Sequence, residues 1–295
     1  TLALELEVDW VGLSFVRSVK DIEQLRQLIT AANSHAGIVS KIEKPEAVAD
    51  IDAIIAATDA VMVARGDLGV EVPMESVPLI QKMIIKKSIL HAKPVIVATQ
   101  MMESMMDSLT PSRAEVNDVA NAVLDGADAV MLSGETSVGQ YPVEVVQAIA
   151  KIILSSESIS EKVKGTKRPK LNDERLVNKT LCYHGVRVAD QVDARAICAM
   201  TFSGYSAQLV SSHRPQAAIY AFTAKRSILN KLSLHWGLKG FFYDGMQSTD
   251  ETFKEISQAV KVGGLVDKRD FIVQLASMPI EARGTTNTLR VSEVK

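Results

Sequence analysis

The first half of the chain repeats one unit, in which a short apolar run is followed by a polar turn and an amphipathic stretch. The apolar runs consist of β-branched or small residues on consecutive positions, which is typical of strands covered on both faces. Two of the amphipathic stretches begin with helix-capping pairs, Ser18 with Asp21 and Ser112 with Glu115. Five successive units predict a parallel sheet, either a barrel or a doubly wound sheet. The predicted strands are residues 10–16, 38–42, 60–64, 95–98 and 129–132.

The pattern changes near residue 155, where a polar and basic stretch up to residue 170 is typical of a solvated linker. A helix is expected at about 174–192, and a second α/β set follows it. We therefore expect two domains, residues 1–158 and 159–295. The predicted strands of the second domain are 196–201, 217–222, 238–243 and 271–275, with an edge strand at 285–291.

Composition narrows the function classes. The 295 residues carry a formal net charge of −2, and no basic stripe favours nucleic acid or an anionic membrane as a partner. Cys182 and Cys198 are the two cysteines of the sequence, which disfavours a disulfide framework. No apolar run reaches membrane-spanning length and no signal peptide opens the sequence, so a reducing cytosol fits best. Because Thr1 starts directly in an apparent element, the sequence is expected to begin in mid-domain.

Charged and hydroxyl residues follow the apolar runs at corresponding places. In a barrel the carboxyl ends of all strands open on one face, and that face holds the active site. These side chains are therefore expected to converge, although they lie far apart in the sequence. They are Lys41, Glu43, Asp67, Thr99, Ser133 and Glu135.

This set has a chemical logic. Glu43 and Asp67 could hold one hard divalent cation, and Lys41 would lie on the same face of the strand as Glu43. Gly66 would let backbone N–H groups approach an anionic oxygen closely. A single Lys or Glu at a strand end is usually only solvated, but the combination favours function. Arg65 is better interpreted as a structural ion-pair or interface residue than as a catalytic one.

Several strings at these positions resemble pyruvate kinase, and the resemblance runs through essentially the whole chain. The strings are residues 41–43 (KIE), 62–69 (MVARGDLG), 98–101 (ATQM), 113–115 (RAE), 118–128 (DVANAVLDGAD) and 131–136 (MLSGET). The resemblance implies an α/β fold, with the last five strands of a TIM-type (β/α)8 barrel followed by a smaller α/β sandwich domain with a regulatory role. It places the first barrel strands and a lid domain outside this chain.

The resemblance also implies phosphoryl transfer between phosphoenolpyruvate and ADP, giving pyruvate and ATP. Lys41 matches the catalytic lysine, and Glu43 and Asp67 match the ligands of Mg²⁺ or Mn²⁺. The backbone of Gly66 and Asp67, with the Thr99 hydroxyl, would hold the substrate carboxylate, and Thr99 and Ser133 would order water for protonation of the enolate. K⁺, a homotetramer and a cytoplasmic location are further expectations. The K⁺ and nucleotide ligands fall in the absent part, so activity of this chain by itself is not expected.

In the second domain, the loop at residues 201–206 resembles the effector phosphate loop of the family, with Thr201, Ser203, Gly204 and Ser206 as candidate ligands. A plain strand-to-helix turn is the alternative. Phe202 and Tyr205 stand where some members have basic residues, which disfavours a sugar bisphosphate. A sugar monophosphate, a nucleotide or no effector remain open.

Two rival functions remain. One is another enolate-forming barrel enzyme, such as a citrate-lyase-like aldolase, and residues 98–101 and the second α/β domain argue against it. The other is a non-catalytic effector-binding or assembly module. A coupled pyruvate assay separates the first from pyruvate kinase, and ligand binding at residues 203–206 without turnover would favour the second.

Overall fold

The computed structural model describes residues 2–159, 168–245, 248–278 and 285–295. The chain divides into two compact units, Thr1–Lys164 and Gly165–Lys295, which are described separately. The boundary expected near residue 158 lies next to residues 160–167, which fall outside the described residues, and it stays a prediction.

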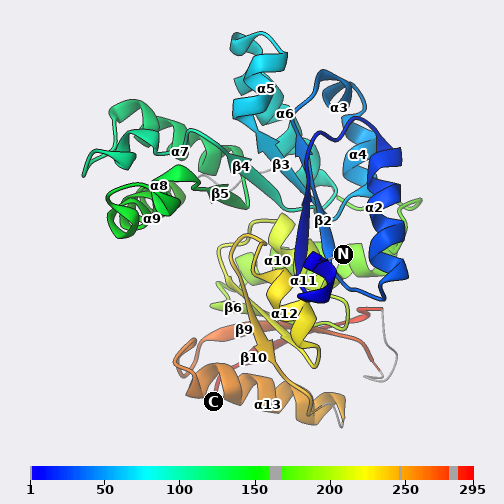
Figure 1. Cartoon of the computed structure of the whole chain (residues 1–295). Coiled ribbons are helices and arrows are strands. Elements are labelled where there is room, and N and C mark those ends of the chain that lie inside the picture. Colours follow the sequence, from blue (N-terminus) through cyan, green and yellow to red (C-terminus); the bar gives the residue numbers. More distant parts are fainter. Residues whose placement is uncertain (1, 160–167, 246–247, 279–284) are drawn as a thin grey trace. The chain divides into compact units, whose positions relative to one another are not determined.

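The first unit is a parallel sheet with helices between its strands (Figure 1). Its strands are β1 (Trp10–Leu13), β2 (Gly37–Ile42), β3 (Ala60–Ala64), β4 (Val95–Ala98) and β5 (Ala129–Met131). Its helices are α1 (Leu2–Glu5), α2 (Val19–Ala31), α3 (Pro45–Ala49), α4 (Ile51–Ala57), α5 (Arg65–Glu71), α6 (Val77–Leu90), α7 (Arg113–Asp125), α8 (Gly134–Ser137) and α9 (Pro142–Ile159), with 3-10 turns η1 (Met74–Ser76) and η2 (Glu103–Met106).

The strand order decides between the two architectures left open by the sequence. All neighbours in the order β1-β2-β3-β4-β5 are parallel, and the order nowhere reverses. A doubly wound sheet reverses its order at a switch point, whereas a barrel adds each strand beside the previous one. The unit is therefore a part of a (β/α) barrel, and the predicted fold class is confirmed.

Local signals set the helix ends. The Asp21 carboxylate accepts the backbone N–H of Ser18 at 3.0 Å at the start of α2. At the start of α7, the Ser112 hydroxyl accepts the N–H of Glu115 at 3.2 Å, and the Glu115 carboxylate accepts the N–H of Ser112 at 2.7 Å. Gly126 ends α7 with φ of 97°, a conformation that glycine adopts without steric cost.

Alternate residues of the central strands form the core of the unit. Ile42, Val63 and Val97 are fully buried and belong to one apolar cluster with Ile54 of α4 and Ile84 of α6. The period of two along a strand places Lys41, the neighbour of Ile42, on the opposite face. The face of the sheet that carries Ile42, Val63 and Val97 is thus covered by helices.

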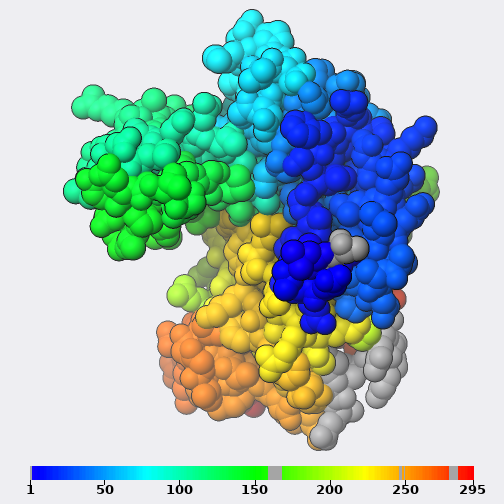
Figure 2. Space-filling view, in the orientation of Figure 1, coloured from blue at the N-terminus to red at the C-terminus, as the bar shows by residue number. Residues whose placement is uncertain are grey.

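Helices α7 and α9 pack on each other through Val119 and Val145, which are both fully buried. Figure 2 shows this segment, coloured green, as a lobe beside the cyan segment of the same unit. It follows strand β4, so the residues between β4 and α7 link the site edge to this lobe.

The second unit contains a mixed sheet of order β10-β9-β6-β7-β8, in which β10 runs antiparallel to β9 and the other pairs are parallel. This arrangement confirms the predicted final edge strand. The strands are β6 (Ala196–Met200), β7 (Ala218–Thr223), β8 (Leu238–Phe242), β9 (Phe271–Ala276) and β10 (Thr288–Glu293). The helices are α10 (Leu176–Gln191), α11 (Tyr205–Ser212), α12 (Arg226–Leu232) and α13 (Thr249–Val262).

Both faces of this sheet are covered. Cys198 and Met200 of β6 share an apolar cluster with Phe253 and Ile256 of α13. Ala199, whose side chain points to the other face, clusters with Ala207 of α11 and Leu232 of α12.

Cys182 and Cys198 are both buried and free, and burial raises the pKa of each thiol to about 12. Among the described residues, no helix is both long and apolar enough to cross a membrane.

His213, which follows α11, has an environment that suits its neutral form. Its ring lies 5.7 Å from the Tyr183 ring, and its Nδ1 atom is buried with no hydrogen-bond partner. Burial, and to a smaller extent the Arg187 charge, lower the pKa of His213 from 6.5 to about 4.

We expect the second unit to lose stability as the pH falls from 6.5 towards 4. In this window the unfolded chain binds a proton that folded His213 excludes, so the free energy of unfolding falls, by roughly 3 kcal/mol at pH 4. Urea unfolding at a series of pH values, followed by Trp236 fluorescence in a Trp10→Phe background, measures this free energy of unfolding. His213→Gln should flatten the pH dependence, whereas His91→Gln, at an exposed histidine of the first unit, should leave it unchanged. An equally steep dependence in His213→Gln would contradict the assignment.

Candidate active site

The strand register aligns the residues predicted to carry chemistry. Ile42 pairs with Val63, Val63 with Val97, and Val97 with Val130. Glu43, Gly66, Asp67, Thr99 and Ser133 all follow this row within a few residues. The carboxyl ends of four strands thus bring them to one edge of the sheet, as the sequence predicted.

The Glu43 carboxylate is the buried centre of this edge. Its side chain is 1% exposed, and its Oε1 atom lies 2.7 Å from Lys41 Nζ. Its Oε2 atom accepts the backbone N–H of Phe15 at 2.5 Å. Lys41 Nζ also donates to the Ser14 hydroxyl at 3.0 Å. A buried carboxylate needs such compensation, because transfer of its charge out of water costs several kcal/mol.

Gly66 and Thr99 contact each other directly. The N–H of Gly66, in the first turn of α5, donates to Thr99 Oγ1 at 2.8 Å. Thr99 and the following Gln100 both have left-handed backbone conformations, with φ of 71° and 54°. Such conformations cost of order 1–3 kcal/mol and are kept only where neighbouring contacts enforce them. The hydroxyl of Thr99 here stands where an anionic oxygen could accept the same N–H.

Arg65 supplies the contacts that enforce this turn. Its guanidinium binds both carboxylate oxygens of Asp118, at 2.8 and 2.7 Å, and donates to the carbonyl oxygen of Thr99 at 2.6 Å. Its side chain is 11% exposed. Both contacts with Asp118 come from one guanidinium nitrogen, Nη1, and the other, Nη2, donates to Thr99. This agrees with the expected structural ion pair of Arg65 and ties the β4 turn to helix α7.

The remaining predicted residues differ in their surroundings. Asp67 and Ser133 are exposed, and the carboxylate of Asp67 makes no ion pair to another described residue. Glu135 is buried at the start of α8. It is 4% exposed, and its two carboxylate oxygens accept the N–H groups of Met102 and Ser133, at 3.2 and 2.7 Å. Both oxygens of Glu135 are thus engaged by the local backbone, and its convergence with the other strand-end residues stays a prediction.

The donor set suits a hard divalent cation. Glu43 Oε1 is buried and has no well-aligned hydrogen bond, and an ammonium group is its nearest charged neighbour. Within the described residues, no group of three or more His, Cys, Asp or Glu side chains could enclose a metal. Two carboxylates with open positions are what Mg²⁺ typically takes when substrate oxygens and water complete its shell. Glu43 and Asp67 are thus the residues that could hold such an ion.

Two family profiles match the chain. One, described as "Pyruvate kinase, barrel domain", matches residues 1–146, and the other, described as "Pyruvate kinase, alpha/beta domain", matches residues 179–292. The chain belongs to the pyruvate kinase family. The order of the two profiles along the chain follows the order of the two units.

Individual relatives agree with this assignment. A pyruvate kinase of Mycobacterium tuberculosis (strain H37Rv) is 41% identical over 295 residues, which is 100% of this chain and 61% of the relative. One from Corynebacterium efficiens is 42% identical, over 98% of the chain and 60% of the relative. A crystal structure of a pyruvate kinase from Cryptosporidium parvum matches with a TM-score of 0.92 and 33% identity, over 99% of this chain and 60% of that one. The chain thus spans about three fifths of the length of these relatives.

The predicted effector loop of this family member is largely closed on itself. Thr201 and Ser206 are 6% and 5% exposed. Thr201 Oγ1 accepts the N–H of Gly204 at 2.9 Å, and the Ser206 hydroxyl shares a 2.5 Å hydrogen bond with Thr286. Ser203 is exposed. An effector role for the loop stays a prediction, with Ser203 as the accessible side chain among the four candidates.

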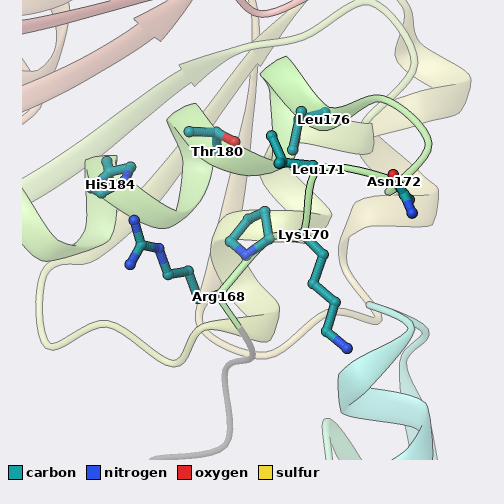
Figure 3. Close-up of a pocket in the computed structure, with 8 residues that line it drawn as sticks. Arg168, Lys170, Leu171, Asn172, Leu176, Thr180 and His184 are labelled. Carbon is teal, nitrogen blue, oxygen red and sulfur yellow. The ribbon is translucent and has the colours of Figure 1, made fainter.

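The second unit also has a cavity of about 740 Å³ between the segment before α10 and the helix itself. Figure 3 shows Arg168 reaching toward His184 while Lys170 points away from it. The volume lies in the range of small-molecule pockets. None of the four predicted effector residues lines this cavity, so it is a separate feature of the unit. Its lining residues are Arg168, Pro169, Lys170, Leu171, Asn172, Leu176, Thr180 and His184.

Sequence reasoning missed Ser14 and Phe15. The predicted first strand, residues 10–16, contained both residues, whereas β1 ends at Leu13, so Ser14 and Phe15 lie in the turn that follows it. Their contacts with Lys41 and Glu43 place them at the site edge. The first strand therefore contributes to the site as the next four do.

We expect the Asp118→Ala substitution to lower the free energy of unfolding of the first unit by roughly 2 kcal/mol, because it leaves the Arg65 guanidinium partly buried and unpaired. Asp52→Ala is the matched control, since Asp52 is 70% exposed and pairs with Lys87 at 2.6 Å. Loss of that surface pair should cost at most about 0.5 kcal/mol. Urea unfolding followed by Trp10 fluorescence in a Trp236→Phe background compares the two, and equal losses would contradict the structural role of Asp118.

Proposed function

We propose that this chain supplies the later barrel strands and the α/β domain of a pyruvate kinase that transfers a phosphoryl group between phosphoenolpyruvate and ADP. The observation that carries the proposal is the Lys41–Glu43 pair at the carboxyl end of β2, beside the Gly66–Thr99 contact. A cation, a carboxylate and a backbone donor that a substrate oxygen could take over from Thr99 suit a substrate that bears phosphate, carboxylate and enolate oxygens.

Lys41 would act on the transferring group. Its ammonium is compact, carries three donors and stands on a flexible stem, so it can move from Glu43 to a phosphoryl or enolate oxygen. Phosphoryl transfer depends mainly on positioning and on charge stabilisation. Mg²⁺ or Mn²⁺, when bound at Glu43 and Asp67, would neutralise charge on the substrate oxygens. Lys41 would then stabilise the negative charge that develops on the enolate.

Gly66 and Thr99 would orient the substrate. The Gly66 N–H has one acceptor, Thr99 Oγ1. A substrate carboxylate could take over this N–H, together with that of Asp67. The Thr99 hydroxyl, which donates to the carbonyl of Ala98 at 2.6 Å, could then rotate to donate to the substrate. Ser133, which is exposed at the same edge, would help Thr99 to order the water that protonates the enolate. A hydroxyl suits this role because it both donates and accepts.

The wider setting is part of the same proposal. Family membership supports a K⁺ requirement, a homotetramer, a phosphorylated effector and a cytoplasmic glycolytic role. The ligands for K⁺ and much of the nucleotide site are proposed to lie in family segments that this chain does not match. We therefore propose that the 295-residue chain alone lacks useful turnover.

The proposal is tested with the chain joined to the part of the Mycobacterium tuberculosis relative that precedes the matched region. With phosphoenolpyruvate, ADP, Mg²⁺ and K⁺, this fusion should form pyruvate, at roughly 1–100 per second.

Lys41→Met in the fusion should reduce turnover by about a hundredfold or more, with a smaller effect on KM, because it removes charge needed in the transition state. Lys87→Met, at a surface lysine, is the control. Near-normal turnover of Lys41→Met would contradict the catalytic role.

Glu43→Gln and Asp67→Asn should each weaken Mn²⁺ binding by about tenfold or more, because a neutral amide is a poorer ligand for a hard dication. Calorimetric titration of the chain with Mn²⁺ measures this without turnover. Glu23→Gln, which changes an exposed carboxylate of α2, should leave the affinity unchanged. If neither site variant changes the affinity, the metal binds elsewhere.

A further inference from the structure

The turn after β1 contacts both members of the Lys41–Glu43 pair. Ser14 Oγ accepts a hydrogen bond from Lys41 Nζ at 3.0 Å, and the N–H of Phe15 donates to Glu43 Oε2 at 2.5 Å. Lys41 Nζ in turn lies 2.7 Å from Glu43 Oε1. The four groups form a closed ring of contacts between two neighbouring strands.

The backbone of this turn has a strained conformation that allows the Phe15 N–H to reach Glu43. Phe15 has φ of 54°, a left-handed conformation that is uncommon for a bulky residue. The ring of Phe15 does not explain this conformation by burial, since it is 56% exposed. Strained conformations persist where surrounding contacts over-determine them. The contact that depends on this conformation is the N–H donated to the buried Glu43 carboxylate.

The turn is also held from the side of α5. Lys44 Nζ lies 5.5 Å from the centre of the Phe15 ring and 2.6 Å from Glu71 Oε1 of α5. Attraction between an ammonium group and an aromatic face restrains the exposed ring. The turn is therefore fixed against the end of β2 and, through Lys44, against the helix that begins with Gly66 and Asp67.

We propose that Ser14 and Phe15 form a positioning element for the reaction: the Ser14 hydroxyl holds the Lys41 ammonium, and the Phe15 N–H holds Glu43, so that Oε1 faces the site. The inference rests on the proposed function. Neither residue contacts a reacting atom in this arrangement. Without the Ser14 hydroxyl, Lys41 keeps Glu43 Oε1 as its partner and competes more strongly with a cation for that oxygen. A flexible lysine stem has many conformations, so one hydrogen bond that selects among them affects rate more than substrate affinity.

Ser14→Ala, Ser14→Thr and the control Ser158→Ala test the role of the hydroxyl. Ser158 lies on α9, and its hydroxyl donates to the carbonyl of Ser155 in the same helix. In the fusion enzyme, Ser14→Ala should lower kcat by about tenfold, with KM for phosphoenolpyruvate within about threefold. Ser14→Thr, which keeps the hydroxyl, should retain at least about a third of kcat. Since Ser14 is exposed, all three melting temperatures should stay close to that of the unmodified protein.

Mn²⁺ titration of the 295-residue chain gives a second readout that needs no turnover. Ser14→Ala should weaken Mn²⁺ binding by about threefold to tenfold, because Lys41 then competes for Glu43 Oε1. Ser158→Ala should stay within about twofold, because that hydroxyl donates only to the carbonyl of Ser155 within α9. If the unmodified fusion forms no pyruvate, the proposed function is overturned. The Mn²⁺ titration of the 295-residue chain would still show whether Ser14 positions Lys41. Unchanged Mn²⁺ affinity in Ser14→Ala, or a Ser14→Thr variant no better than Ser14→Ala, would overturn the inference.

Discussion

The first unit depends on one constraint, the burial of the Glu43 carboxylate at the end of β2. A carboxylate that is 1% exposed is stable in the folded chain only if each oxygen finds a partner. Lys41 serves one oxygen and the N–H of Phe15 serves the other. The strained turn after β1 and the orientation of the lysine both follow from this requirement. The contacts that offset the cost of burying the Glu43 carboxylate thus also orient Lys41 and Glu43.

Three of the left-handed residues of the first unit lie at the same edge of the sheet. Phe15, Thr99 and Gln100 have φ of 54°, 71° and 54°, and they follow the ends of β1 and β4. Each such residue costs of order 1–3 kcal/mol. Hydrogen bonds offset that cost, since Glu43 accepts from Phe15, and Arg65 donates to the carbonyl of Thr99. The ion pair of Arg65 with Asp118 carries this restraint into α7, so a residue far from the chemistry in sequence stabilises the turn that holds Thr99.

In the second unit, two polar side chains that follow the first strand already have hydrogen-bond partners. Thr201 and Ser206 satisfy their hydroxyl groups with Gly204 and Thr286, whereas Asp67 and Ser133 of the first unit remain exposed. Polar groups that are already paired must exchange partners before they bind a ligand. Both α/β units thus place polar residues directly after their strands. In the first unit some of these residues are exposed and could bind a ligand directly, whereas in the second unit Thr201 and Ser206 would first have to give up a hydrogen bond.

The sequence by itself determined which segments form strands, because short runs of consecutive apolar residues bounded by polar turns are a local signal. It misplaced the end of the first strand, which stops at Leu13 and not at residue 16. It also identified Lys41, Glu43, Asp67, Thr99 and Ser133 as strand-end residues, and the family strings predict roles for them. Tertiary structure decided what no local pattern contains. The strand order selected a barrel, burial turned Glu135 toward the backbone of Met102 and Ser133, and the register of β1 against β2 brought Ser14 and Phe15 to the Lys41–Glu43 pair. Hydrophobic periodicity shows which face of a strand is buried, but the partner of each polar group depends on contacts between residues far apart in the sequence.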